Sequence, residues 1–262
     1  MTPRPTPSRR GRLPADRRSF SKPGYLAESR KPLTVLLFVC PLVIAYELAV
    51  TASTFDDLPG IAARGVLARF FDLFGVAGVH VPAIALVVSL LAAHVLRGDR
   101  WKLRPLVAFG IAVEGAALAI PLLVLSAIAG GGAAAALTQT AAAEPGSAAS
   151  WRDAVALAIG AGLYEETVFR LLGFAVLGLV LEDVIGLKKG TWTIIAVIVT
   201  SLAFAAFHGM PGSGGISVPR FILYALAGVY FAILYVLRGF GVAVGAHTVY
   251  DIVALMPAVM SE

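Results

Sequence analysis

The sequence places two adjacent acids and an arginine inside a long apolar segment: Glu165, Glu166 and Arg170, between Ala154 and Leu181. Ionised groups at bilayer depth are costly, at roughly 2.5–3.5 kcal/mol for an acid or an arginine near the centre of a membrane helix. A cluster of three such groups is therefore a candidate functional site. A buried ion network that only holds helices together would use the same residue types, so the cluster has to be judged with other motifs.

The spacing of the three residues separates their expected roles. Glu166 and Arg170 are four residues apart and face each other on an α-helix, so we expect Arg170 to neutralise Glu166. Glu165 lies about 140° from Arg170 around the helix axis, at about 100° per residue. We therefore expect Glu165 to project from another face without a charged partner. An unpaired carboxylate in an apolar surrounding is suited to general acid–base catalysis.

Two further polar motifs occur in apolar segments downstream. Phe204 precedes His208 by one helical turn, where the segment 192–207 ends. His247 and Asp251 are four residues apart in the segment 241–259, so Asp251 can hold the imidazole in one tautomer. Each motif alone also fits an interfacial histidine or a helix-packing hydrogen bond. Three other polar residues in apolar segments are interpreted as structural: Glu47, Glu114 and Tyr164.

Composition and charge indicate a membrane protein. The 262 residues are 58% hydrophobic and 14% charged, whereas a soluble domain is about 25% charged. The first 31 residues carry nine Lys or Arg and two acids, a net +7, which leaves −2 for the rest of a chain whose total is +5. We interpret residues 1–30 as a disordered, basic cytoplasmic tail that contacts anionic lipid, with no nucleic-acid partner. The single cysteine, Cys40, excludes an intrachain disulfide.

Apolar segments of about 20 residues predict an all-α, polytopic transmembrane helical bundle of seven to eight spans over residues 31–262. We expect seven spans, at 33–52, 79–96, 106–129, 154–181, 192–207, 221–237 and 241–259. The segment 61–74 is either an interfacial helix or a short eighth span, and 130–150 is interpreted as a loop. The first span is expected to stay uncleaved, because Pro41 and Glu47 interrupt its apolar run.

The distribution of basic residues between these spans predicts an orientation. Lys and Arg gather in the tail, in the segments 97–104 and 181–190, and at Arg238. The positive-inside rule then puts the N-terminus in the cytoplasm and the C-terminus outside. The high Ala, Gly, Arg and Pro content favours a bacterial inner membrane. In this topology Glu165 and His208 lie toward the outer ends of their spans and His247 near a cytoplasmic end, so tilt or a kink must bring them level.

The three motifs together carry a resemblance to a known family. Glu165-Glu166-xxx-Arg170, then Phe204-xxx-His208, then His247-xxx-Asp251 resemble the motifs of the CAAX protease and bacteriocin-processing (CPBP, or Abi) family, which includes the type II CAAX prenyl endopeptidase. The resemblance covers about residues 150–255. It implies an all-helical intramembrane endopeptidase of the glutamic type, a hydrolase that needs no metal cofactor.

The resemblance also implies roles for individual residues. By position, Glu165 matches the catalytic glutamate and His208 its water-activating partner, with Glu166, Arg170 and Phe204 in support. His247 and Asp251 match the pair that stabilises the oxyanion. The family's third motif commonly ends in Asn, and an ionised Asp251 cannot donate a hydrogen bond. We therefore expect Asp251 to orient His247, which itself donates to the oxyanion.

Two other functions remain open at this point. Glu165, His208 and His247 could be the ligands of a zinc metalloprotease, although the chain has no HExxH motif. Alternatively, the polar clusters could belong to a non-catalytic immunity factor, scaffold or small transporter. If the protein is a protease, we expect a membrane-anchored protein or peptide as substrate, whether a prenylated C-terminus, a sorting tail or a peptide precursor.

Overall fold

The computed structural model describes residues 24–52, 62–128, 151–208 and 218–260, and among these it has helices and no strand. In chain order the elements are α1 (Tyr25–Glu28), α2 (Pro32–Ala52), α3 (Ala62–Asp72), α4 (Val81–Leu96), α5 (Pro105–Ile128), α7 (Trp151–Glu165), η1 (Glu166–Leu172), α8 (Gly173–Gly178), η2 (Leu179–Val184), α9 (Lys189–Phe207), α10 (Val218–Arg238) and α11 (Phe240–Met260). The predicted all-α class is confirmed for these residues. The predicted loop at 130–150 lies outside them.

Four helices are long and apolar enough to cross a membrane by length and composition: α2, α5, α9 and α10. Two shorter apolar helices accompany them, α4 and the part of α11 from Phe240 to Met256. With 11 residues, α3 is about 16 Å long at 1.5 Å per residue, half of the roughly 30 Å of a hydrocarbon core. The interpretation of 61–74 as an eighth span therefore fails, and the count of seven stays a prediction.

One long helix extends three residues beyond each end of the predicted segment 154–181. The elements α7, η1, α8 and η2 follow one another without a break from Trp151 to Val184. Their 34 residues extend over roughly 50 Å, and two stretches, η1 and η2, are π-helical. Glu165 and Glu166 lie near the middle of this long helix, where the α-helical hydrogen-bonding pattern gives way to the π pattern. A site at this point lies between the two ends of the bundle.

The contacts made at glycines give the relative directions of the helices around the centre. Ile111 and Gly115 of α5 lie beside Gly241 and Gly245 of α11 in the same order, so these two helices are parallel. The helix α2 contacts the same two glycines in the same order, through Val35 and Phe38. By contrast, Gly173 of α8 faces Thr200 of α9 and Gly178 faces Trp192, which makes that pair antiparallel. These directions agree with the alternation expected for the first, third, fourth, fifth and seventh spans.

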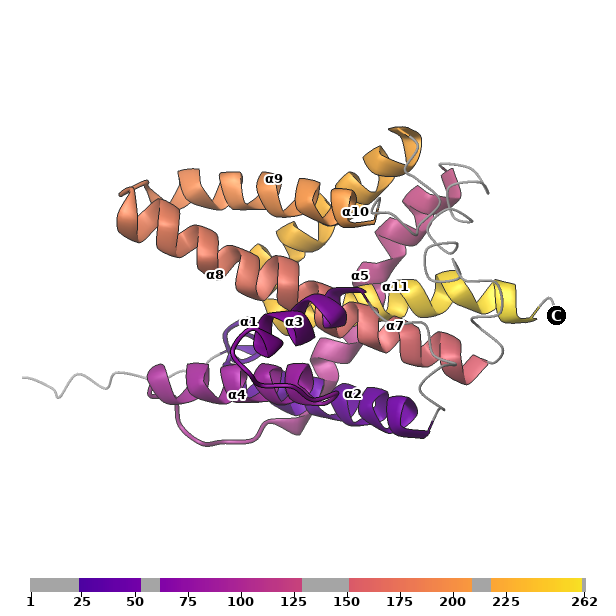
Figure 1. Ribbon diagram of the computed structural model, residues 1–262, viewed down its shortest axis with the longest axis horizontal. Helices are drawn as coiled ribbons and strands as arrows, with labels where there is room; N and C mark the ends of the chain where they lie inside the picture. The colour runs from indigo at the N-terminus through magenta and orange to yellow at the C-terminus, as the bar shows by residue number, and fades with distance from the viewer. Residues whose placement is uncertain (1–23, 53–61, 129–150, 209–217, 261–262) are drawn as a thin grey trace, which may run out of the picture.

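Close approach between helices depends on glycine at two central positions. A Cβ at Gly115 would lie 2.9 Å from the backbone of Gly245, and a Cβ at Gly162 would lie 2.2 Å from Thr248 Oγ1. Small residues let membrane helices pack backbone to backbone. In this way α5 and α7 both reach α11, which lies at the centre of the bundle (Figure 1).

Basic segments that are far apart in the sequence meet at one end of the bundle. Arg104 Nε lies 3.0 Å from Glu28 Oε2, and Arg30 Nη2 donates to the carbonyl oxygen of Val236 at 2.6 Å. Arg238 binds both carboxylate oxygens of Glu114. The segment 25–31, the 97–104 segment and the turn between α10 and α11 thus share one end, as the predicted orientation requires. The opposite end holds the start of α7 and the last turn of α11 (Figure 1).

The same contacts correct the predicted extent of the disordered tail. Residues 1–23 lie outside the described part of the chain, but Tyr25 to Glu28 form α1, which packs on the bundle. The Tyr25 hydroxyl donates to Glu114 Oε2 at 2.6 Å, and burial together with Glu114 raises the pKa of Tyr25 to about 12. Glu28 is buried between Lys31 and Arg104. Arg104 and Glu114, which are remote in the chain, help to hold these residues in place, and local composition could not predict such contacts.

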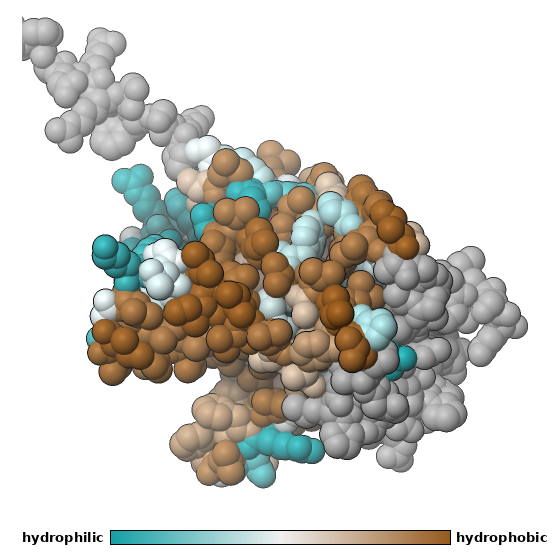
Figure 2. Space-filling model, turned by 90° about the horizontal axis from the view of Figure 1, so that it is seen from above, coloured by the Kyte–Doolittle hydropathy of each residue, from teal (hydrophilic) through white to brown (hydrophobic). Residues whose placement is uncertain are grey.

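The outer surface is strongly apolar. Large hydrophobic side chains are exposed on every described helix, among them Leu48, Phe109, Ile120, Ile194 and Val253. Figure 2 shows such side chains over much of the face in view, with the hydrophilic groups gathered in smaller areas. A monomeric soluble protein rarely exposes so extensive an apolar surface. Contact with lipid hydrocarbon explains it.

Candidate active site

The centre of the site is an ion pair with no exposure to solvent. Arg170 Nη1 donates to Glu166 Oε1 at 3.1 Å, and both side chains are 0% exposed. The predicted i, i+4 pair is therefore confirmed. Arg170 Nη2 also donates to the carbonyl oxygen of Gly228 at 2.9 Å, and its guanidinium lies over the Phe204 ring at 4.7 Å. Arg170 thus joins the long helix to α9 and α10.

The same carboxylate oxygen also holds a histidine. His247 Nδ1 lies 2.8 Å from Glu166 Oε1. An ionised carboxylate beside a guanidinium only accepts hydrogen bonds, so His247 Nδ1 is the donor. His247 is 4% exposed, and its ring stacks on Phe231 at 4.4 Å between centroids. Glu166 and Phe231 together fix both the tautomer and the plane of this imidazole.

Glu165 faces two imidazoles rather than an arginine. Its Oε2 atom lies 3.6 Å from His208 Nε2 and 3.7 Å from His247 Nε2. Both distances exceed a direct hydrogen bond, and this buried oxygen has no hydrogen-bond partner among the described residues. Contacts of this length between polar groups are typical of groups bridged by water. Glu165, His208 and His247 therefore enclose a position suited to a water molecule.

This arrangement corrects the expectation that Glu165 and Glu166 serve separate faces. Both carboxylates reach His247, Glu166 at Nδ1 and Glu165 toward Nε2. The ring of His247 lies between them, because α11 packs against the long helix where α7 ends and η1 begins. Irregular π-helical turns are frequent at functional sites, since they re-aim side chains that a regular α-helix would separate.

His208 is held in a defined tautomer at the end of α9. Its Nδ1 atom lies 2.8 Å from the carbonyl oxygen of Phe204. A carbonyl can only accept, so Nδ1 carries the hydrogen, and Nε2 is left facing Glu165. The ring stacks on Tyr224 at 4.3 Å with an interplanar angle of 20°. Phe204 thus contributes its backbone to His208 and its ring to Arg170.

Asp251 lies near the same ring nitrogen of His247 that faces Glu165. Its Oδ2 atom is 3.4 Å from His247 Nε2, longer than the 2.8 Å contact of Glu166 with Nδ1. The expectation that Asp251 orients the imidazole is therefore revised, because Glu166 makes the shorter contact, on the opposite nitrogen. Asp251 instead lies beside the nitrogen that faces Glu165.

Sequence reasoning missed the contribution of α10. Tyr224 stacks on His208, the carbonyl oxygen of Gly228 accepts a hydrogen bond from Arg170, and Phe231 stacks on His247. They follow one another at steps of four and three residues, which places them on one helix face. That spacing was visible in the sequence. Aromatic residues and glycine in an apolar helix are so common, however, that the pattern indicates packing rather than a site.

A bound metal ion would need several His, Cys, Asp or Glu side chains arranged around one point. Glu165, His208 and His247 converge, yet no group of three or more His, Cys, Asp or Glu side chains in the described ranges has an arrangement that could hold one. His247 Nδ1 is held by Glu166, and its Nε2 faces Glu165 and Asp251. The expectation that the site needs no metal stays a prediction.

Comparison with known families agrees with the three motifs. Residues 147–253 match the family described as type II CAAX prenyl endopeptidase Rce1-like. This region of the chain is similar to that family. Neither the curated proteins nor the solved structures compared with the chain match it significantly.

The match includes every residue of the candidate site, and it begins just before the long helix. The resemblance drawn from the motifs is thus confirmed, and the family is one of proteases. Together with the four apolar helices, the match identifies an integral membrane protein.

Proposed function

We propose that this protein is an intramembrane endopeptidase of the glutamic type, in which Glu165 activates water. The observation that supports this most strongly is the position of Glu165 Oε2, buried and within 3.7 Å of two imidazole nitrogens. A packing role for these residues would give direct hydrogen bonds. A water molecule between the three groups, in contrast, would satisfy Glu165 and the Nε2 atom of His208 at once.

The first chemical step uses the tautomer of His208. Its Nδ1–H is donated to Phe204, so Nε2 of the neutral ring can only accept. Glu165 and His208 are then two acceptors for the two hydrogens of one water. Glu165 takes a proton, the resulting hydroxide attacks the peptide carbonyl carbon, and the electron pair of that C=O bond moves to its oxygen. Glu165 later returns the proton to the departing amine as the C–N bond breaks.

The oxyanion requires a donor, and His247 is the candidate. With Nδ1–H donated to Glu166, the Nε2 atom of a neutral ring would only accept. Donation to the oxyanion therefore requires the doubly protonated ring. Three carboxylates lie within 4 Å of His247, those of Glu165, Glu166 and Asp251, and they stabilise that positive charge. In this mechanism Asp251 balances the charge of His247 and does not touch the oxyanion.

The charges of the site support the same interpretation. Three carboxylates and one guanidinium sum to −2 when both histidines are neutral. Protonation of His247 reduces this to −1, which lowers the cost of keeping the cluster inside an apolar bundle. The resulting site has a base, a cation and a position for water, as hydrolysis of an amide requires.

The substrate is a membrane-associated protein or peptide. The site lies midway along a helix of 34 residues, so a peptide bond must enter the bundle to reach it. The family's name refers to prenylated C-terminal peptides; a sorting tail or a peptide precursor in the same membrane would present the same chemistry. A bacterial inner membrane with a cytoplasmic N-terminus remains part of this proposal.

A paired substitution tests the proposal. Cells carrying Glu165→Gln are compared with cells carrying Glu182→Gln, an exposed acid on the same long helix, by mass spectrometry of membrane-protein termini. We expect uncut termini to accumulate only with Glu165→Gln, and purified wild-type protein to cleave those proteins in detergent. If Glu165→Gln cleaves them at the wild-type rate, the glutamic mechanism is wrong. If no terminus changes, the non-catalytic immunity or scaffold function is favoured.

A further inference from the structure

A second polar network lies on another side of the long helix. The Tyr164 hydroxyl donates to Glu47 Oε1 at 2.7 Å, and Glu47 Oε2 contacts His80 Nδ1 at 2.5 Å. Tyr164 is 0% exposed, whereas the side chain of His80 is 49% exposed. These three residues, which we term the Tyr164 network, connect the long helix through α2 to the start of α4. They lie outside the three motifs.

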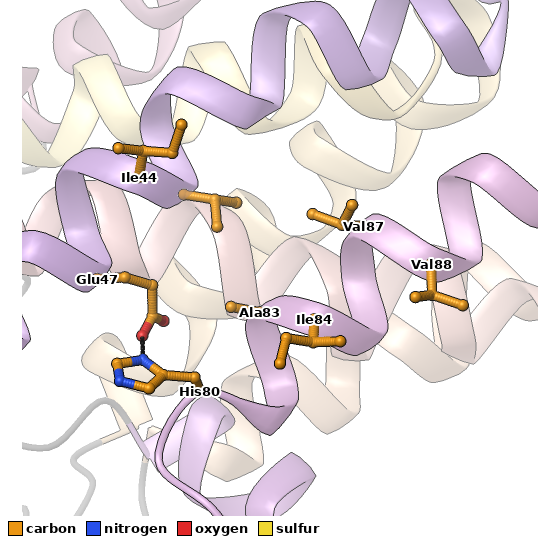
Figure 3. A pocket seen from close by; sticks show the side chains of 8 residues that line it. Ile44, Glu47, His80, Ala83, Ile84, Val87 and Val88 are labelled. Atoms are coloured by element: carbon orange, nitrogen blue, oxygen red, sulfur yellow. Dashed lines mark hydrogen bonds and ion pairs between the residues drawn. The ribbon is translucent and has the colours of Figure 1, made fainter.

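The network is braced by a second layer. The Tyr164 ring packs edge-on against Tyr46 at 5.3 Å, and the Arg64 guanidinium lies over the Tyr46 ring at 5.7 Å. Arg64 also donates to the carbonyl oxygen of Val79, next to His80. Figure 3 shows Glu47 and His80 at one end of a shallow, otherwise apolar pocket between α2 and α4. A glutamate at this depth is costly without partners, and Tyr164 is one of its two side-chain partners among the described residues.

We infer that Tyr164, held by Glu47 and His80, is a positioning residue for Glu165. Tyr164 and Glu165 are the last two residues of α7 before the π-helical turn, so their side chains project about 100° apart around one helix axis. Fixing Tyr164 to α2 therefore fixes the rotation of the helix at Glu165. This inference rests on the proposed function, because it concerns how Glu165 is aimed at water.

The geometry sets the size of the effect. A helix with its side chains has a radius of about 5–6 Å, so a rotation of 10° moves a carboxylate by roughly 0.9 Å. Displacements of about 1 Å at a reacting group can cost about 100-fold in rate. Glu165 makes no direct hydrogen bond to His208 or His247, so the site itself restrains it weakly. Restraint through the neighbouring residue Tyr164 has correspondingly more influence.

The test compares two tyrosines with the same kind of hydrogen bond. Tyr164→Phe removes only the hydroxyl and keeps the ring on Tyr46. Tyr25→Phe removes an equivalent tyrosine–glutamate hydrogen bond, to Glu114, at the end of the bundle. With an identified substrate, we expect Tyr164→Phe to lower kcat about 10-fold or more with KM unchanged, and Tyr25→Phe to leave kcat within about 2-fold of wild type.

A second pair separates positioning from general loss of structure. Glu47→Gln keeps an oxygen that accepts from Tyr164 and should retain most of the activity, whereas Glu47→Met should match Tyr164→Phe. Hydrogen exchange gives a readout without activity: amides of residues 160–172 should exchange faster in Tyr164→Phe and Glu47→Met and should be unchanged in Tyr25→Phe. If Tyr164→Phe does not fold, the two Glu47 variants carry the test.

The outcomes distinguish the two proposals. If cleavage depends on Glu165 while Tyr164→Phe and Glu47→Met keep the wild-type kcat, the positioning role is wrong and the proposed function stands. Equal losses of kcat in Tyr164→Phe and Tyr25→Phe would likewise overturn it, since they would reflect a general loss of stability. If cleavage does not depend on Glu165, the proposed function fails, and hydrogen exchange over 160–172 still decides whether the network restrains the helix.

Discussion

The buried pair of Glu166 and Arg170 provides a prediction that separates stability from catalysis. Glu166→Gln leaves Arg170 charged and fully buried, with the Gly228 carbonyl and the Phe204 ring as its neighbours. Breaking a buried pair by removing one partner typically destabilises a protein by about 3–5 kcal/mol. Gln keeps an oxygen that can accept from Arg170 at 3.1 Å. We therefore expect a loss at the lower end, about 3 kcal/mol.

The double variant Glu166→Gln with Arg170→Gln removes both charges. Replacing a buried ion pair by a neutral pair is often close to neutral, so we expect the double variant to be at least about 1.5 kcal/mol more stable than the sum of the single losses predicts. Catalysis should not follow stability. In the double variant His247 Nδ1 still lacks an ionised acceptor, so turnover should stay about 100-fold or more below wild type, the scale of a lost oxyanion donor.

The assay is unfolding in mixed detergent micelles, followed by tryptophan fluorescence. Trp192 lies beside Gly178 in the contact between α8 and α9, so its emission reports on the helix pair next to the site. Activity is measured on the same samples. If the single losses simply add in the double variant, the pair is not an interacting unit and the reasoning is refuted. If the double variant regains activity with stability, Glu166 does not serve His247.

Three further predictions concern other parts of the molecule. His247→Ala should lower turnover about 100-fold or more. Asp251→Asn keeps an acceptor beside Nε2, so it should change turnover only mildly. A collapse of kcat in correctly folded Asp251→Asn would instead assign the negative charge an essential role. Gly115→Ala should lower the free energy of unfolding by about 1–3 kcal/mol through overpacking against Gly245, while Gly65→Ala, with open space around it, should be neutral or slightly stabilising in the same micelle assay. Purified protein should contain less than one zinc per chain and stay active after prolonged dialysis against a strong chelator. One zinc per chain by elemental analysis, with activity lost on chelation and restored by zinc, would establish the metalloprotease alternative.

Much of the fold followed from the sequence because the membrane restricts the choices. Apolar length alone predicted helices at 33–52, 106–129 and 221–237, and the structure has them within a few residues. The i, i+4 rule predicted the pair of Glu166 and Arg170. Both inferences use local periodicity, which the sequence contains in full. The ordered segment at Tyr25–Glu28 escaped prediction because its partners, Arg104 and Glu114, are remote in the chain.

The candidate site shows where local reasoning ends. Helical spacing placed Glu165 and Glu166 on different faces, and they do project differently from the backbone. The spacing could not show that α11 brings the ring of His247 between them, with Nδ1 at Glu166 and Nε2 toward Glu165. That position depends on close packing of α7 on α11, which Gly162 permits beside Thr248.

The helix-to-helix contact, rather than the motif itself, thus determines which carboxylate orients His247 and which one is left for water. Glu166 is engaged by Arg170 and by His247 Nδ1, so its oxygen Oε1 cannot also act as a base. Glu165 has neither partner, and its Oε2 faces only nitrogen atoms that lie beyond direct hydrogen-bonding distance. Two chemically identical neighbours in the sequence therefore acquire different roles from their surroundings. In the proposed mechanism, the order of charges from Arg170 through Glu166 and His247 to Glu165 leaves the last carboxylate to act as the base.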